Sequence, residues 1–333
     1  MADNYDVEVS ITQETVIGSV GFGTPLIFAG KETKAVPYKE CSSLEEIKSA
    51  GFAEETNTYK AAKLLFMQDN APKTIAVCAS TEVTATALGT IMDKAWRQLI
   101  VVSLATEEES TVKEIADYIE TTKDRVLFMS VESTVGLAGM NGLDRTYAIV
   151  YGGATEFPEA AIVGATAGLD AGSFTYKNMI LKGVEPEKLS ASELSAIHEA
   201  NGNAILQKAG DVVPSEGKAI SGQYLDIVDS KDYIISNIQY KEQKLFNLNP
   251  KVPYTNKGIA AMENEVINVL LDACSMGIIA TDDDDKYIYS TNFPPRSDVS
   301  ETDRAERVYR SGRFSFELAG AVHNVKINGT LSV

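Results

Sequence analysis

Residues that carry chemistry are scarce in this chain of 333 residues, which has only two histidines and three cysteines. Cys41, Cys78 and Cys274 lie far apart, with no Cys-x-x-Cys pair and no histidine at the spacing of a metal site. Cys78 lies in the apolar run 75–79, a setting typical of a buried, reduced thiol. We therefore expect no disulfide, no metal site and no cofactor, in a protein of a reducing cytoplasm.

Long apolar runs and a leader are also missing. No stretch approaches the roughly 18 apolar residues that a membrane-spanning helix requires. Residues 1–5 contain neither a basic region nor an apolar run, so we expect no signal peptide. The sequence predicts a soluble protein without membrane insertion.

Basic residues are outnumbered by acidic ones. The 30 Lys and Arg against 47 Asp and Glu give a net charge of −17, with a pI near 4.6. Nucleic-acid binding needs clustered Lys and Arg to neutralise phosphates, so nucleic acid is not expected as a main partner. The acidity instead suits a protein that must stay soluble at high concentration before it assembles.

The sequence contains no recognisable catalytic motif. His198 falls in an expected amphipathic helix and His323 in an expected terminal strand, without an evident carboxylate or nucleophile partner. There is no Gly-x-Ser-x-Gly motif. The glycines at 18, 21 and 23 lack the further glycine, or the Gly-Lys-Ser/Thr, of phosphate-binding loops. We expect no catalytic residue and no nucleotide site.

Four aspartates, Asp282 to Asp285, stand in a row before Lys286. An EF-hand loop needs alternating ligands, a central glycine and a glutamate at its twelfth position, and this run has none of that arrangement. Adjacent carboxylates repel one another, which favours a solvated hairpin turn. An adventitious cation site is the alternative.

The first half of the chain alternates short Val/Ile-rich runs with helical periodicity, which predicts βαβ units and a largely parallel sheet. The expected strands are 26–29, 74–79, 98–104, 125–131 and 147–150, and the expected helices are 56–69, 82–95 and 106–121.

The second half has a different pattern and predicts an α+β arrangement. Small residues dominate 157–173, which indicates a tightly packed helix, and Ser190 with Glu193 has the pattern of a capping box. The long expected helices are 224–246 and 257–277, and the expected strands are 204–207, 218–220, 286–290 and 313–318.

Both ends of the chain alternate between apolar and polar residues, which is the pattern of half-buried strands. The apolar faces are Val7, Val9 and Ile11 in residues 6–12, and Val325, Ile327, Leu331 and Val333 in residues 323–333. Terminal strands with an apolar face and unpaired backbone groups are templates for pairing, within the chain or with a neighbour. Self-assembly is therefore the first hypothesis.

A basic stripe precedes the last strands, where Arg304, Arg307, Arg310 and Arg313 recur at every third residue. One interpretation is pairing with acidic residues of the same segment. The other is docking on an acidic surface of a neighbouring subunit or partner. The sequence leaves both open.

Three segments resemble the sheath proteins of contractile phage tails and related phage-tail-like particles. Residues 10–27, which include Val-Gly-Phe-Gly-Thr-Pro-Leu-Ile, resemble the N-terminal arm and following strand of the short sheath-like proteins. Residues 160–170, Ala-Ala-Ile-Val-Gly-Ala-Thr-Ala-Gly-Leu-Asp, are similar to the family's alanine- and glycine-rich helix. Residues 314–329 resemble its closing strands, and 257–279 resembles the long helix before them.

The resemblance implies a two-domain sheath-type subunit, α/β and α+β in class, with extended N- and C-terminal β-strand arms. Residues 1–25 would form the N-terminal arm, 26–185 an outer α/β domain, and 186–333 a C-terminal α+β assembly domain. Such subunits stack around an inner tube while their arms complete a sheet in neighbouring copies. Many sheath proteins are considerably longer, so we expect little outer decoration.

The implied partners are further copies of the chain, the tail tube protein, and baseplate and terminator proteins. The implied location is a virion tail assembled in the cytoplasm of a bacterial host. The expected subunit interface consists of the arm residues Val7, Val9, Ile11, Val325, Ile327 and Leu331, and of Arg304, Arg307 and Arg310.

Two other classes of protein compete with this interpretation. An α/β metabolic enzyme with an unrecognised site is favoured by the βαβ pattern alone. A surface-layer or other lattice protein is disfavoured by the missing signal peptide. The sequence does not distinguish a phage from a tail-like bacteriocin, and it leaves helix 257–279 and the arginines as alternative contacts to the tube.

Overall fold

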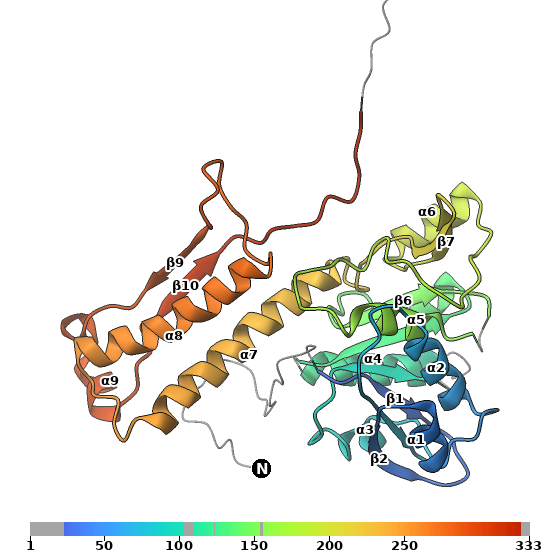
Figure 1. Cartoon of the computed structure of the whole chain (residues 1–333), viewed down its shortest axis with the longest axis horizontal. Helices are drawn as coiled ribbons and strands as arrows, with labels where there is room; N and C mark the ends of the chain where they lie inside the picture. Colours follow the sequence, from blue (N-terminus) through green and yellow to red (C-terminus); the bar gives the residue numbers. More distant parts are fainter. Residues whose placement is uncertain (1–22, 103–108, 123, 154–155, 328–333) are drawn as a thin grey trace, which may run out of the picture.

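A computed structural model describes residues 23–102, 109–122, 124–153 and 156–327 (Figure 1). Residues 26–224 build a body around one β-sheet, and the long helix α7 (Leu225–Leu248) runs from this body into a smaller lobe. Helix α8 (Asn256–Ser275) returns beside α7, and a two-stranded sheet packs on α8. We call these two parts the body and the lobe.

The sheet of the body has six strands in the order β2-β3-β1-β4-β5-β6. Five strands run parallel, and β2 pairs antiparallel with β3 at one edge. Strands β1, β3, β4 and β5 are buried along their whole length, as a parallel sheet covered on both faces requires. The strands are β1 Leu26–Ala29, β2 Val36–Cys41, β3 Ile75–Ala79, β4 Gln98–Val101, β5 Val126–Val131 and β6 Thr146–Val150.

Helices cover both faces of this sheet, so the body has three layers. Helices α2 and α5 pack together on one face, and α3 and α4 on the other. Each face has its own apolar cluster, with Phe128 in the first and its neighbour Leu127 in the second, because successive strand residues point to opposite sides. The helices of the body are α1 Leu44–Ser49, α2 Asn57–Phe66, α3 Ala85–Gly89, α4 Glu109–Thr122, α5 Pro158–Thr166 and α6 Ala191–Glu199, with a 3-10 turn at Thr134–Leu137.

Helix α5 is enclosed by its neighbours because its residues are small. Every residue from Pro158 to Thr166 is buried. A Cβ atom on Gly164 would lie only 2.3 Å from the carbonyl oxygen of Leu65 in α2. The expectation of a tightly packed helix in this segment is confirmed, although the helix ends at Thr166, before residue 173.

Helix α6 and the hairpin of β7 (Ile205–Lys208) and β8 (Asp211–Pro214) extend the body beyond the β6 edge. The backbone N–H of Asn203 and its side-chain amide both donate to the carbonyl oxygen of Ala148, at 2.9 Å each. The capping box at Ser190 and Glu193 is confirmed. Residues 203–220 are therefore hydrogen-bonded to the sheet. The domain boundary expected at residue 185 stays a prediction.

The lobe has a separate core between α7, α8 and the antiparallel pair of β9 (Tyr289–Asn292) and β10 (Arg313–Phe316). Helix α9 (Glu301–Glu306) and a 3-10 turn (Arg296–Asp298) connect the two strands. Helix α7 belongs to both cores, because Leu225 and Val228 lie in the body and Ile234 and Ile238 in the lobe. Its 24 residues correspond to about 36 Å of helix.

Most expected elements are present, with a few differences. The helix expected over 82–95 is only the five-residue α3, and turns follow it. In these turns the indole N–H of Trp96 donates to the carbonyl oxygen of Ile91 at 2.8 Å. The strand expected over 218–220 is a single bridge between Lys218 and Tyr224. Strands β2 and β8 and helices α1 and α9 were not expected. The strand expected over 6–12 lies outside the described residues.

Replacing Gly164 by Ala will lower the free energy of unfolding by about 1–3 kcal/mol, because the new Cβ must push α5 away from the backbone of α2. Gly320→Ala is the matched control, since nothing lies within 4 Å of a Cβ at that position. Chemical denaturation followed by circular dichroism measures both. Equal stabilities would contradict the close approach of the two helices.

Candidate assembly surfaces and the junction that positions them

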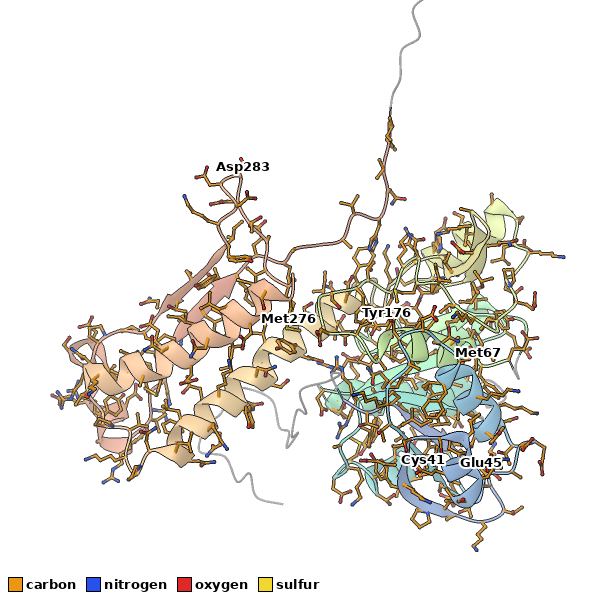
Figure 2. The ribbon with its side chains drawn as sticks, viewed as in Figure 1. Cys41, Glu45, Met67, Tyr176, Met276 and Asp283 are labelled. Atoms are coloured by element: carbon orange, nitrogen blue, oxygen red, sulfur yellow. The ribbon has the colours of Figure 1, made fainter. Side chains whose placement is uncertain are left out.

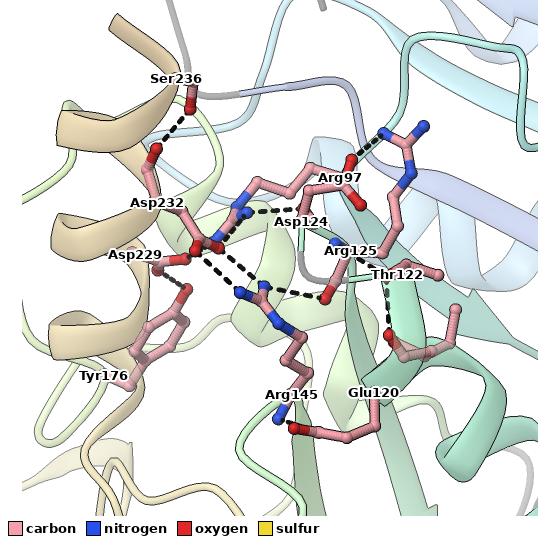
Figure 3. Close-up of polar contacts among 11 residues, drawn as sticks. Arg97, Glu120, Thr122, Asp124, Arg125, Arg145, Tyr176, Asp229, Asp232 and Ser236 are labelled. Carbon is pink, nitrogen blue, oxygen red and sulfur yellow. Dashed lines mark hydrogen bonds and ion pairs between the residues drawn. The ribbon is translucent and has the colours of Figure 1, made fainter. Parts of the chain in front are cut away.

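Buried ion pairs anchor the first turns of α7 on the body (Figure 3). Arg97 Nη1 lies 2.8 Å from Asp232 Oδ2, and Arg97 Nη2 pairs with Asp229. Arg145, just before β6, donates to both carboxylate oxygens of Asp232 at 2.7 and 2.8 Å. The exposed fractions of Arg97, Asp229 and Asp232 are 3%, 5% and 3%, so these ion pairs lie out of water.

The two aspartates share one face of α7 because they are three residues apart. Burial alone would raise the pKa of Asp232, but the positive charges of Arg97 and Arg145 hold it below its ordinary value. Tyr176 donates to Asp229 Oδ2 at 2.6 Å, and burial together with Asp229 raises the pKa of this tyrosine far above its ordinary value. The junction therefore contains an ionised Asp232 and a neutral Tyr176 at neutral pH.

The C-terminal segment carries apolar side chains into solvent. The strand expected over 323–333 is absent from its described part, because residues 319–327 form no strand, and beyond the body end of α7 the chain runs away from both body and lobe (Figure 1). Val322, Val325 and Ile327 are 81%, 73% and 88% exposed. The expected interface residues Val325 and Ile327 are thus available to a partner, whereas Val7, Val9, Ile11 and Leu331 lie outside the described residues.

The sheet of the lobe is small, and its strands have unoccupied sides. No further strand pairs with β9 or β10 among the residues that the structure describes. An open groove of about 460 Å³ lies against this sheet. Tyr287, Tyr289, Ser315, Phe316 and the carboxylates of Asp282 and Glu317 line it. The groove thus places aromatic rings and two acidic groups beside unpaired strand edges.

The arginine stripe is partly satisfied within the lobe. Arg310 pairs with Asp303 and, at 3.1 Å, with Glu306, while Arg304 donates to two backbone carbonyl oxygens. Arg307 ends α9 with φ of 61° and is exposed, with no acidic partner in the described part of the lobe. Intramolecular pairing therefore accounts for Arg310 and for Arg304, which also lies 3.8 Å from Glu301, and the exposed Arg307 stays available to a neighbour.

His198, for which the sequence offered no partner, contacts a serine. Its Nε2 lies 2.9 Å from Ser215 Oγ, which also accepts the backbone N–H of Ala204 at 2.9 Å. Burial lowers the pKa of His198, with further lowering by nearby lysines. Ser215 is only 2% exposed, so the pair ties α6 to the end of β8 rather than presenting a nucleophile. His198 and Ser215 are 17 residues apart, and no sequence motif connects them.

The acidic run forms the expected hairpin turn, with Asp283 at its projecting tip (Figure 2). Asp282 Oδ1 accepts the backbone N–H groups of Asp284 and Lys286, each at 2.9 Å. In the described ranges, no group of three or more His, Cys, Asp or Glu side chains is arranged to hold a metal ion. No helix in those ranges is long and apolar enough to cross a membrane.

The three cysteines are buried free thiols, as expected. Burial raises the pKa of Cys78 to about 12, so this thiol stays protonated at neutral pH. A buried, protonated thiol is a poor nucleophile and a poor metal ligand. The cysteines therefore belong to the packing of the two cores.

Replacing Asp232 by Ala will lower the free energy of unfolding by about 3–5 kcal/mol, because Arg97 and Arg145 each lose a buried partner. Asp272→Ala is the matched control, since it removes a more exposed pair with Lys241 in the same helix hairpin and should cost less than about 1 kcal/mol. Urea denaturation distinguishes the two. A small loss in both variants would argue against the junction as the anchor of α7.

Comparison with known proteins was made by sequence and by structure. No protein-family model and no curated protein sequence matches the chain. A chain from the baseplate of the anti-feeding prophage superposes with a TM-score of 0.70 at 12% identity, covering 98% of this chain and 99% of that one. A chain from the contracted PVC sheath complex of an extracellular contractile injection system gives 0.68 at 13% identity, covering 98% of each. The sheath tail protein from Desulfitobacterium hafniense gives 0.60 at 7% identity, covering 86% and 93%. The chain therefore has the fold of contractile tail sheath proteins, as its sequence resemblance indicated.

Proposed function

We propose that this chain is a structural subunit of a contractile tail sheath, which polymerises helically around an inner tube and contracts to drive that tube through a cell envelope. One observation carries the proposal: the fold matches chains of sheath and baseplate complexes over 98% of this chain and nearly all of theirs. Both body and lobe therefore have counterparts. A subunit of this kind acts through shape and contact, and the role is not enzymatic.

The lobe and the chain ends form the assembly part, and the body faces outward. Of the twelve exposed large apolar side chains in the described residues, nine lie beyond residue 225. Such side chains mark contact surfaces when they gather in one region. The hydrogen bonds of residues 203–220 to the sheet favour a division between the parts at the start of α7, rather than at residue 185.

The arms pair across subunits by strand addition. Val325 and Ile327 supply the apolar face of the C-terminal arm together with Leu331, and Val7, Val9 and Ile11 supply that of the N-terminal arm. The acceptor is the β9–β10 sheet, because its strands have no further strand neighbour among the described residues. Such a contact joins different surfaces of successive copies, so it does not close and propagates as a helix.

Contraction releases energy that is stored during assembly. The extended sheath is a kinetically trapped state, and its subunits rotate and repack into a better-packed one while the arms act as hinges. No cofactor or hydrolysis is required. The partners are other copies, the tail tube protein, and baseplate and terminator proteins, in a virion tail assembled in a bacterial host cytoplasm. Arg307, with Arg304 and Arg310 beside it, faces an acidic surface of a neighbour.

Val325→Asp and Ile327→Asp will each lower the yield of polymer more than about tenfold, because a charge replaces an apolar side chain that the acceptor buries. Val322→Asp is the control, since the exposed residue 322 precedes the expected strand 323–333, and this variant should polymerise normally. Negative-stain microscopy and sedimentation, with and without the tube protein, measure the yield. Equal yields from all three variants would reject the hypothesis that the C-terminal arm binds a neighbouring subunit.

Deleting residues 1–14 should leave a folded monomer that does not polymerise, because the N-terminal arm strand is lost while the described body and lobe remain intact. Circular dichroism and size-exclusion chromatography test the folding, and sedimentation tests the assembly. Polymers of normal width from this truncation would remove the N-terminal arm from the proposal.

A further inference from the structure

One residue of the C-terminal segment differs from its neighbours. From residue 319 to residue 327 every side chain is exposed except that of His323. Its Nδ1 atom is buried and has no hydrogen-bond partner in the described structure. A half-buried side chain in the middle of an otherwise exposed segment indicates a specific docking point.

The docking point is a cradle at the body end of α7. His323 Nε2 lies 3.1 Å from Thr175 Oγ1, and its ring meets the ring of Tyr224 edge-on, with centroids 4.6 Å apart and planes at 88°. Tyr224 is the residue that precedes α7, and Lys218 Nζ lies 5.4 Å from the centroid of the same ring. Edge-to-face aromatic contact and a hydrogen bond together fix both the position and the orientation of the imidazole.

A carboxylate on the first turn of α7 lies beside this cradle. Burial raises the pKa of Asp226, and a hydrogen bond from Thr175 and the nearby His323 partly offset that effect. If Thr175 donates to Asp226, its oxygen is left to accept from His323 Nε2–H. The hydrogen bond therefore uses Nε2, and Nδ1 has no partner in the described structure.

The residues before His323 connect it to the lobe. Leu318 bridges Ile279, and the backbone N–H of Ala319 donates to the carbonyl oxygen of Ile278 at 2.9 Å. Residues 319–322 then cross from the sheet of the lobe to the end of α7 in the body (Figure 1). In the described structure this strap is a second link between lobe and body beside α7, and the noncovalent contacts of His323 attach it to the body.

We propose that His323 is a pin that fixes the C-terminal arm to the body, so that every subunit presents the arm from one place and in one direction. The proposal rests on the sheath function and adds a positioning residue to it. His323 acts through the arm that it orients, and it makes no contact with the neighbouring subunit itself.

The pin lowers the entropy that the C-terminal arm loses when it binds to a neighbouring subunit. Without it, the described contacts that hold this segment would end at Ala319, whereas with it they extend four residues further, to His323. A shorter free segment has fewer conformations to lose on binding, so its effective concentration at a nearby acceptor is higher. The strap also ties the root of the arm to the junction that sets the direction of the lobe.

A spin label on the arm tests the pin in the full-length protein below its polymerising concentration. Lys326→Cys accepts a nitroxide selectively, because Cys41, Cys78 and Cys274 are buried. Adding His323→Ala should lower the ratio of docked to free arm by about twofold to tenfold. The lines of the electron paramagnetic resonance spectrum should then narrow, because the label moves more freely. His323→Gln, whose amide nitrogen replaces Nε2, should restore most of the restriction. Val325→Ala is the matched control and should leave the spectrum unchanged.

An unchanged spectrum in His323→Ala overturns the pin. Thr175→Val tests the same hydrogen bond from the body and replaces His323→Ala if circular dichroism shows that variant to be unfolded. Thr175→Val should narrow the spectrum too, and the double variant should add nothing to the effect of His323→Ala. Additive effects of the two substitutions would show that they do not act through one contact.

Assembly provides the functional test. His323→Ala should raise the protein concentration at half-maximal polymerisation by about twofold to tenfold, with polymers of normal width above it. Polymerisation at the parental concentration would overturn the role of the pin in assembly. If the parent protein forms no polymer even with the tube protein, the sheath proposal fails, while the spin-label result still decides whether His323 holds the arm.

Discussion

The burial of four charges between α7 and the sheet determines how the two parts of the molecule are joined. Arg97 and Arg145 meet Asp229 and Asp232 out of water, and separating a buried pair leaves an uncompensated charge that costs several kcal/mol. A shift of α7 by one residue would turn its aspartates about 100° away from the arginines. Helix α7 therefore leaves the body in one orientation, and α8 and the β9–β10 sheet inherit that orientation by packing.

A rigid junction suits the proposed sheath subunit, in which the contacts between copies change during contraction. The small residues of α5 let it pack against the backbone of α2, which leaves the body little room to deform. The apolar side chains of Val322, Val325 and Ile327, by contrast, are left exposed by the described part of the monomer. In the proposed sheath, free energy is gained at the contacts between subunits, while the body and lobe move as one frame. The strap that ends at His323 joins the C-terminal arm to this frame.

Local patterns predicted much of the fold, and distant polar contacts were beyond them. Buried strands such as β3 and the capping box at Ser190 follow from local sequence, because apolar runs and caps act over a few residues. Strand β2 was missed because it contains a proline and two adjacent charged residues, as a mostly exposed strand at an edge of the sheet allows. The junction was missed because Arg97 and Asp232 are 135 residues apart, and no spacing rule connects them. The serine partner of His198 and the cradle of His323 were missed for the same reason.

Both terminal segments were predicted as interfaces from alternation alone, and the exposure of the described C-terminal residues creates a hazard that the rest of the chain must limit. A free segment with Val322, Val325 and Ile327 in water invites uncontrolled pairing between copies. A net charge of −17 opposes such encounters, because whole molecules repel one another before their arms can meet. That repulsion is screened over about 8 Å at physiological salt, whereas strand pairing acts only at contact. Growth of the proposed polymer is therefore favoured at an existing end, which holds an acceptor edge in place. An arm that already points in one direction loses less conformational entropy when it binds that edge.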